Sequence, residues 1–255
     1  MALRRLFVLA STILGCGDPS SQVAPDSPES LCATIVGGFP DDMNSAVAAL
    51  VGADGELYCT GTLVGSADSR SLVLTAAHCL DWPITGVIFG ERYTNPQTHA
   101  AVESVRVHPD FDELSGDFDF AILVLDELVV GVQPLPFAGS RGTGDDLELG
   151  TPLVFIGYGE TEHDLENSRR NAVSGTVLSL TDASFSYGQD EGGPCYGDSG
   201  GPALALLRGE LAVVGVTSHG DGGCWSSGVS GRVSAAADFI GELLKQDFGC
   251  PRNSP

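Results

Sequence analysis

Two short strings of this chain, residues 74–79 and 197–202, restrict the structures that it can adopt. The first reads Leu-Thr-Ala-Ala-His-Cys and presents His78, and the second reads Gly-Asp-Ser-Gly-Gly-Pro and presents Ser199 in a glycine-rich bend. Between them, Asp119 opens an apolar run. A serine hydroxyl is a poor nucleophile at neutral pH, so it needs a base within hydrogen-bond reach and an acid that orients the base. These residues therefore predict a nucleophilic site that the fold assembles from distant segments.

The order of the three residues along the chain is base, acid, nucleophile. In their local strings, His78, Asp119 and Ser199 resemble the trypsin/chymotrypsin family of serine endopeptidases. The string Ile-Val-Gly-Gly at 35–38 resembles the mature N-terminus of that family, and the resemblance runs from about residue 35 to about residue 245. It implies an all-β fold of two six-stranded antiparallel β-barrels with a C-terminal helix. It also implies an enzyme that hydrolyses protein or peptide substrates.

The composition agrees with an all-β chain that has a substantial core. The 255 residues are 42% hydrophobic and include 34 glycines. Short apolar runs bounded by Gly, Pro, Asn or Asp are typical of strands, and they occur at 71–75, 121–125, 153–156, 172–180 and 211–217. The segment 235–246 instead predicts a helix, from the spacing of its apolar residues. We place the N-terminal barrel at about 35–134 and the C-terminal barrel at about 135–234.

The first sixteen residues have the features of an export signal. Arg4 and Arg5 form a basic region, and the apolar run 6–14 is too short to span a membrane. Residues 13–16 read Ile-Leu-Gly-Cys and resemble a bacterial lipobox, so we expect a lipoprotein signal at 1–16 and lipid on Cys16. An ordinary secretory signal is the alternative. Residues 17–34 indicate a flexible tether or pro-segment, and the domain begins at 35. We expect an exported protein, as a bacterial outer-membrane lipoprotein or an extracellular or periplasmic one.

The charge and the ligand types exclude several partners. A formal net charge of −22 argues against nucleic acid and indicates a well-solvated surface. The sequence predicts no cofactor and no metal site, because Glu91 and Glu103 are too isolated to form a calcium loop. We expect a monomer that binds protein or peptide substrates.

Seven cysteines are an odd number for an exported protein, and lipid on Cys16 would leave six. The family resemblance implies two disulfides: Cys59–Cys79 and Cys195–Cys224. Cys32 and Cys250 then remain, and we infer their pairing by elimination only. Such a pair would keep the pro-segment attached after activation.

The resemblance also implies the roles of the site residues. His78 is the general base and Asp119 orients its ring, while the backbone N–H groups of Gly197 and Ser199 form the oxyanion hole. Ser218 matches the family serine that hydrogen-bonds the acid.

Activation follows from the residues at the start of the domain. In the family, cleavage before Ile35 frees an α-ammonium group that pairs with the acid next to the nucleophile, here Asp198. The residue before the cut is Thr34 rather than Lys or Arg. We therefore expect an activating protease of non-tryptic specificity that tolerates small residues, or self-cleavage.

The resemblance assigns six positions to the substrate pocket: Gly193, Pro194, Ser218, His219, Gly220 and Gly228. Gly193 occupies the position that holds aspartate in trypsin-like members, and Gly220 and Gly228 match wall positions that stay open for large side chains. His219 departs from the tryptophan usual there. We predict an open, uncharged pocket with a preference for large apolar residues, although a shifted alignment could bring Asp190 or Glu191 inward.

Two other functions remain open from the sequence. A catalytically silent relative that acts as a binding module is one, favoured by Thr34 and His219 and opposed by the intact triad. An ester hydrolase is the other, because Gly197, Ser199 and Gly201 also satisfy G-x-S-x-G. An ester hydrolase with this motif requires a helix directly after the nucleophile, and the bend that ends in Pro202 opposes a helix there.

Overall fold

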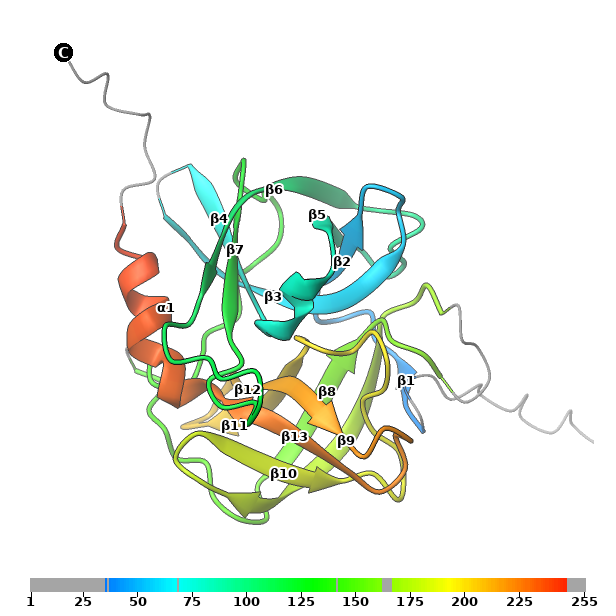
Figure 1. The fold of residues 1–255 in the computed structure, drawn as a ribbon, viewed down its shortest axis with the longest axis vertical. Helices are drawn as coiled ribbons and strands as arrows, with labels where there is room; N and C mark the ends of the chain where they lie inside the picture. The colour runs from blue at the N-terminus through cyan, green and yellow to red at the C-terminus, as the bar shows by residue number, and fades with distance from the viewer. Residues whose placement is uncertain (1–34, 36, 68, 141, 162–166, 247–255) are drawn as a thin grey trace, which may run out of the picture. The chain divides into compact units, whose positions relative to one another are not determined.

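The structure, a computed structural model, describes residues 35, 37–67, 69–140, 142–161 and 167–246. The expected signal, tether, lipidation site at Cys16 and Cys32–Cys250 pair lie outside these residues. Strands dominate the fold (Figure 1), and the predicted two-barrel class is confirmed. The strands are β1 Phe39–Pro40, β2 Val47–Gly52, β3 Leu57–Ala67, β4 Arg70–Thr75, β5 Ile84–Phe89, β6 Thr98–Val107, β7 Ala121–Leu125, β8 Pro152–Gly157, β9 Asn171–Leu180, β10 Ser184–Gly188, β11 Pro202–Leu207, β12 Glu210–Gly220 and β13 Ser227–Arg232.

The first barrel is a closed, antiparallel sheet in the order β2-β3-β4-β7-β6-β5. Its strand β7 is buried at all five residues, which explains why this part of the sequence is a continuous apolar run rather than an alternating one. Strand β4 pairs with β7 over Leu72–Thr75, with Thr75 opposite Ala121, so the chain leaves β4 toward His78 and enters β7 from Asp119 at the same end of the pair. The pairing therefore brings the histidine and the acid to the same edge of the barrel.

The second barrel uses β8 to β13 in the order β9-β10-β13-β12-β11-β8, with β1 added outside β9. Strand β8 pairs with β11 and also with β9, and this second pairing closes the six strands into a ring. Its core includes Phe155, Phe185, Tyr187 and Val214, and Ile35 packs into the same cluster. The start of the predicted domain is thus part of the second barrel's core.

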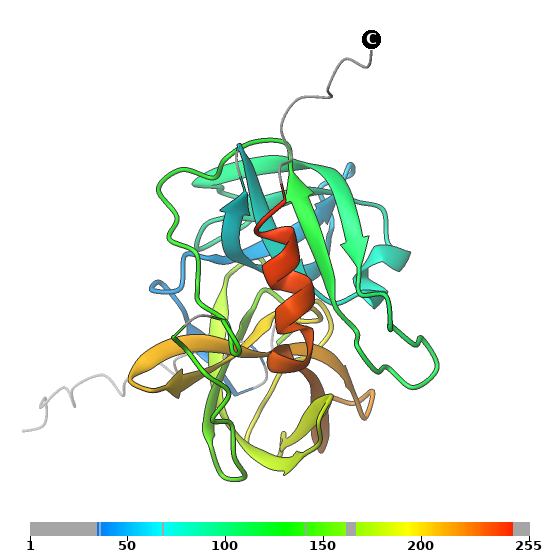
Figure 2. The same ribbon diagram turned by 90° about the vertical axis from the view of Figure 1, so that its left-hand side faces the viewer.

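The C-terminal segment forms a 3-10 turn, Val233–Ala236, followed by the helix α1, Ala237–Leu243. The helix is shorter than the predicted 235–246 at both ends, because residues 235–236 belong to the 3-10 turn and α1 ends at Leu243. Ile240 and Leu243 are buried in the core cluster that contains the first barrel's strands, and Figure 2 shows the helix against them. None of the helices in the described part of the chain has the length and apolar character of a membrane span.

Candidate active site

His78 begins a short 3-10 turn, His78–Asp81, directly after β4. The next residue, Cys79, forms a disulfide with Cys59 on β3. This covalent link fastens the turn to a barrel strand, so the backbone at His78 has little freedom to move. The described cysteines also include the pair Cys195–Cys224. These are two of the three pairs expected from the sequence.

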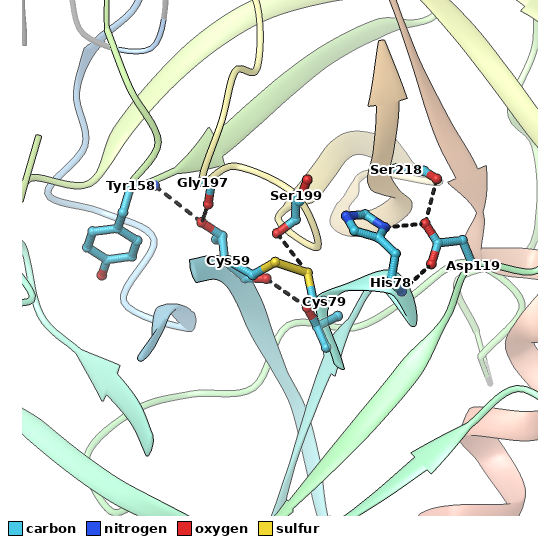
Figure 3. The surroundings of a disulfide bond; sticks show 10 residues. Cys59, His78, Cys79, Asp119, Tyr158, Gly197, Ser199 and Ser218 are labelled. Atoms are coloured by element: carbon cyan, nitrogen blue, oxygen red, sulfur yellow. Dashed lines mark hydrogen bonds and ion pairs between the residues drawn. A yellow bond between two sulfur atoms is a disulfide. The ribbon is translucent and has the colours of Figure 1, made fainter. Parts of the chain in front are cut away.

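Asp119 receives three hydrogen bonds, and two come from His78 (Figure 3). His78 Nδ1 lies 2.7 Å from Asp119 Oδ2, and the His78 backbone N–H donates to Oδ1 at 2.9 Å. The Ser218 hydroxyl donates to Oδ2 at 2.6 Å. Burial alone would raise the pKa of the Asp119 carboxyl, but the bonds from His78 and Ser218 lower it below its ordinary value. A charged Asp119 therefore fixes the ring of His78.

Ser199 lies in a bend between the barrels, and the first barrel holds that bend in place. The backbone N–H of Thr60 on β3 donates to the Ser199 carbonyl at 2.8 Å, and the Thr60 hydroxyl donates to the Gly197 carbonyl at 2.8 Å. Gly197 has φ +91° and Gly200 has φ +79°, in the region that favours glycine. A Cβ on Gly200 would also overlap the Thr75 hydroxyl. Glycine is required here by both conformation and space.

His78 and Ser199 line one open cleft of about 900 Å³. Figure 3 shows the two residues on adjacent segments above the disulfide. Tyr58 and Trp82 also line the cleft, with their rings stacked at 5.5 Å between centroids. These two aromatic residues were not predicted from the sequence, although Tyr58 directly precedes Cys59 and Trp82 directly follows the turn that begins at His78.

A cavity of about 230 Å³ adjoins Ser199. Of the six predicted pocket positions, four line it: Pro194, Ser218, His219 and Gly220. The other two, Gly193 and Gly228, pack against side chains that line the cavity in their place. A Cβ on Gly193 would overlap Gln189, and a Cβ on Gly228 would overlap Tyr187. Neither side chain was predicted from the sequence, because a glycine position does not reveal which neighbouring side chain fills the space beside it.

The acidic residues that could have entered this pocket do not. Asp190 and Glu191 are exposed to solvent, and neither lines the cavity. Its described lining residues include no Asp, Glu, Lys or Arg. His219 is exposed at the rim, and its Nδ1 lies 3.2 Å from the Ser218 hydroxyl oxygen. The described lining of this pocket therefore carries no carboxylate, ammonium or guanidinium group.

Asp198, next to Ser199, is 2% exposed. Its two carboxylate oxygens accept hydrogen bonds from the backbone N–H groups of Gly159 at 2.8 Å and Cys195 at 2.9 Å. Burial raises the pKa of the Asp198 carboxyl to about 7, which these two bonds only partly offset. Among the described residues, no side-chain cation pairs with it. The carboxylate is thus buried where a positive partner would stabilise it.

Within the described ranges, one group of side chains has the spacing of metal ligands: Cys59, His78 and Cys79. The two cysteine sulfurs are joined in the disulfide and are therefore not thiolates. The same group lies beside Ser199, with the Cys79 sulfur 3.6 Å from the Ser199 carbonyl oxygen. We therefore assign the two cysteines of this group a structural role, in which their disulfide holds the turn that carries His78.

The two closed antiparallel barrels and the C-terminal helix make up a chymotrypsin-like fold. Residues 35–240 match the family model for trypsin. Trypsin 5G1 of Aedes aegypti is 30% identical over 233 residues, covering 82% of this chain and 84% of that protein. A trypsin of Saccharopolyspora erythraea is 31% identical over 233 residues, covering 83% and 97%. Chymotrypsin-like elastase family member 1 of Bos taurus is 28% identical over 271 residues, covering 94% and 98%. The chain belongs to the trypsin family of serine endopeptidases, which act on protein substrates.

Proposed function

We propose that the chain cleaves peptide bonds through an acyl-enzyme on Ser199, with His78 as the general base and Asp119 as its orienting acid. The observation that carries this proposal is the set of three hydrogen bonds on Asp119, two of them from His78. The bond to Asp119 occupies Nδ1, and no described residue bonds Nε2 of His78, whose ring shares its cleft with Ser199. A base so oriented takes the proton of the serine hydroxyl and later gives it to the leaving amine.

The second part of the proposal is an oxyanion hole made by the backbone N–H groups of Gly197 and Ser199. The positive φ of Gly197 supports this, because it turns the peptide away from the regular strand direction. Losing one such donor typically costs about 2.7–4 kcal/mol of transition-state stabilisation. The carbonyls in the same peptides as these two N–H groups are those of Tyr196, which accepts from the Glu160 N–H at 2.7 Å, and of Asp198, which accepts from the Gly201 N–H at 2.9 Å. Both peptides are therefore held in place before substrate binds.

A labelling experiment tests the triad. A fluorophosphonate probe should label the chain that starts at Ile35, and Ser199→Ala should abolish both labelling and peptide hydrolysis without changing the circular dichroism spectrum. Asp119→Asn should lower turnover about 10⁴-fold, because the histidine then adopts the wrong tautomer. Full activity of Ser199→Ala would refute the mechanism. A folded chain that never labels would indicate the silent binding module, and faster turnover of lipid esters than of peptides would indicate the ester hydrolase.

Activation by cleavage before Ile35 is a further part of the proposal. The buried Asp198, with a pKa raised to about 7 and no cationic side chain beside it among the described residues, supports it. A new α-ammonium group at Ile35 would supply the charge. The residue before the cut is Thr34, so the activator is a non-tryptic protease or the enzyme itself. Activity should appear on cleavage and fall at alkaline pH as the ammonium loses its proton. Full activity of the uncleaved chain would refute this part.

We also propose that the enzyme prefers large, uncharged residues at P1, the substrate residue before the cleaved bond. The neutral lining of the cavity beside Ser199 supports this. A peptide library should show Phe, Tyr or Leu ahead of Lys or Arg, and a strong Arg preference would overturn it.

The proposed location follows from the sequence alone. Residues 1–16 act as a lipoprotein-type signal, 17–34 as a tether, and the peptidase domain is exported as a monomer. Cys16→Ser should block lipid labelling and release the protein from membranes. Mass spectrometry that finds an unmodified Cys16 in mature, membrane-free protein would refute the anchor.

A further inference from the structure

The cavity beside Ser199 contains a polar side chain that the family resemblance does not assign. Gln189 follows β10, is 2% exposed, and lines the cavity together with Tyr187 and Gly220. Its backbone N–H donates to the Ser226 carbonyl at 3.1 Å, and its own carbonyl accepts from Gly192 at 3.0 Å. Both backbone polar groups of Gln189 are therefore hydrogen-bonded, which fixes the position from which its side chain extends.

One hydrogen bond fixes which way the Gln189 amide faces. Its Nε2 donates to the Pro194 carbonyl at 2.6 Å. Because a carbonyl only accepts hydrogen bonds, the nitrogen must be the atom that faces Pro194. The oxygen Oε1 then faces the other side, 3.5 Å from where a Cβ on Gly220 would stand. Gly220 lines the cavity, so Oε1 is directed into it.

No described residue donates a hydrogen bond to this oxygen. The oxygen is not fully enclosed by protein atoms, so water or a substrate group in the cavity can donate to it. The Gln189 amide also fills the space that a side chain at Gly193 would occupy. The Gln189 amide therefore occupies the space of a side chain at position 193, which is the position that holds aspartate in trypsin-like members.

The rest of the lining restricts which donor fits. The wall around Gln189 includes Tyr187, Pro194, Gly220 and the disulfide Cys195–Cys224, which are uncharged and mostly apolar. An ammonium or guanidinium group there would lose its water without gaining a carboxylate. A neutral ring with one hydroxyl at its end matches both the apolar wall and the free acceptor. Phenylalanine would fill the same wall but leave Oε1 without a donor.

We propose that Gln189 is a specificity-determining residue, whose Oε1 accepts a hydrogen bond from the hydroxyl of a tyrosine at P1. This inference rests on the proposed function, because it assumes that the cavity beside Ser199 holds the P1 side chain. It predicts a preference for Tyr over Phe of about threefold to tenfold in kcat/KM, the usual value of one neutral hydrogen bond.

The test compares peptides that differ only in P1, with Tyr, Phe, Leu or Lys, on protein that starts at Ile35. Gln189→Met keeps the length of the side chain without its carbonyl, and it should lower the Tyr/Phe ratio to about 1 while Leu changes by less than about threefold. Gln189→Glu should raise Lys relative to Tyr at least about tenfold, because it adds a carboxylate to the cavity. Gln133→Met, at an exposed glutamine, is the matched control and should change no ratio.

A companion variant tests the crowding at the same place. Gly193→Asp alone should fold poorly or lose activity, because its side chain overlaps the Gln189 amide. Gly193→Asp combined with Gln189→Gly should recover folding and favour Lys or Arg. Wild-type activity of the single variant would contradict the packing described here.

Fluorophosphonate labelling of Ser199 separates the two possible failures. If no variant is labelled and no peptide is cleaved, the proposed function is wrong. If the wild type is labelled but cleaves the Tyr and Phe peptides equally, the role of Gln189 is overturned. This wild-type ratio decides the inference even if the Gln189 variants do not fold.

Discussion

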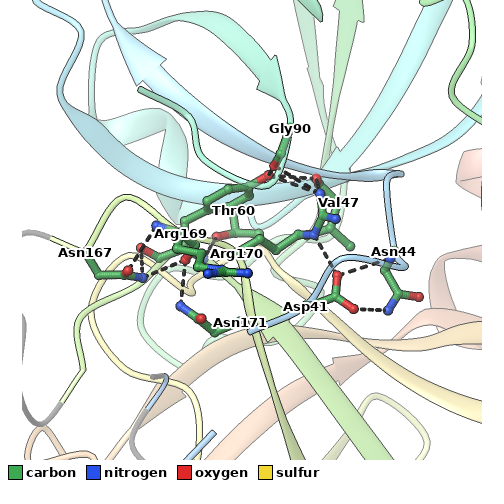
Figure 4. Close-up of polar contacts among 10 residues, drawn as sticks. Asp41, Asn44, Val47, Thr60, Gly90, Asn167, Arg169, Arg170 and Asn171 are labelled. Atoms are coloured by element: carbon green, nitrogen blue, oxygen red, sulfur yellow. Dashed lines mark hydrogen bonds and ion pairs between the residues drawn. The ribbon is translucent and has the colours of Figure 1, made fainter. Parts of the chain in front are cut away.

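Arg170 Nε donates to Asp41 Oδ2 at 2.7 Å, and the two side chains are only 2% and 6% exposed (Figure 4). The same guanidinium donates to the Gly90 carbonyl at 3.1 Å, and the Tyr158 hydroxyl donates to that carbonyl at 2.5 Å. Gly90 directly follows β5, in the connection to β6 of the first barrel, whereas Arg170 directly precedes β9 of the second barrel. The buried pair therefore joins both barrels to the segment that follows Ile35.

Removing one partner of this pair should be strongly destabilising. Arg170→Met leaves Asp41 buried without its cation, which typically costs about 3–5 kcal/mol. Urea unfolding should show the midpoint falling without loss of cooperativity. Arg208→Met, in the exposed pair with Asp146, is the control and should leave the midpoint where it is. An equal fall of the urea midpoint in the two variants would mean that burial of the Asp41–Arg170 pair adds nothing to its contribution to stability.

Ser218→Ala should lower turnover by about tenfold to a hundredfold while leaving KM close to its wild-type value. The hydroxyl supplies one of the three hydrogen bonds on Asp119, and a bond to a charged group is worth about 1.5–3 kcal/mol. Its loss removes one cause that lowers the pKa of Asp119. Steady-state kinetics on peptides check this, with Ser218→Thr expected to restore part of the rate. A variant with unchanged kcat would show that His78 alone keeps Asp119 in place.

The two disulfides should differ in function although their loops are similar in size. Each closes a loop of 20 or 29 residues and should stabilise the fold by about 3 kcal/mol. Replacing Cys59 and Cys79 by alanine should lower kcat for every substrate, because the turn at His78 is released. Replacing Cys195 and Cys224 should instead change the relative rates of P1 residues, because that pair lines the cavity. Identical kinetic changes in both double variants would contradict this division.

The strand positions and the three site strings could be predicted because their signals are local. The apolar run at 121–125 is strand β7, and the Ser218 hydroxyl bonds Asp119 as the family resemblance implies. The strand needs only neighbouring residues, whereas the bond between Ser218 and Asp119, which lie 99 positions apart, follows only from the resemblance to the family. The residues of the Asp41–Arg170 pair are 129 positions apart, and no pattern in one sequence connects them.

The cavity beside Ser199 shows why the position of a residue along the chain was not enough to predict which side chains line it. Gly193 and Gly228 were assigned by their distance along the chain from Ser199 and by resemblance, and both are glycines that leave room. The sequence does not say which side chain takes that room. Gln189 and Tyr187 do so because β10 pairs with β13, which places Tyr187 opposite Gly228. That register is a tertiary property of the second barrel.

The pH dependence of stability should distinguish the chain before and after cleavage at Ile35. In the uncleaved chain the pKa of Asp198 is raised from 3.8 to about 7, so the folded state binds its proton more tightly than the unfolded state. This group therefore stabilises the fold below about pH 4, and that stabilisation is lost as the pH rises toward about 7. After cleavage, an α-ammonium partner should lower the pKa of Asp198 and raise the amine above its ordinary value of about 7.7–8.0. The paired carboxylate then stabilises the fold at neutral pH, until the amine deprotonates at alkaline pH.

The difference in Tm between cleaved and uncleaved protein should thus grow from pH 4 to pH 7 and shrink at alkaline pH, as measured by calorimetry. Asp198→Asn is the control. It should shift the Tm of the cleaved and the uncleaved protein, but the difference between the two Tm values should no longer vary with pH in this way. A Tm difference that stays constant with pH in the wild type would show that Asp198 and the new N-terminus do not pair.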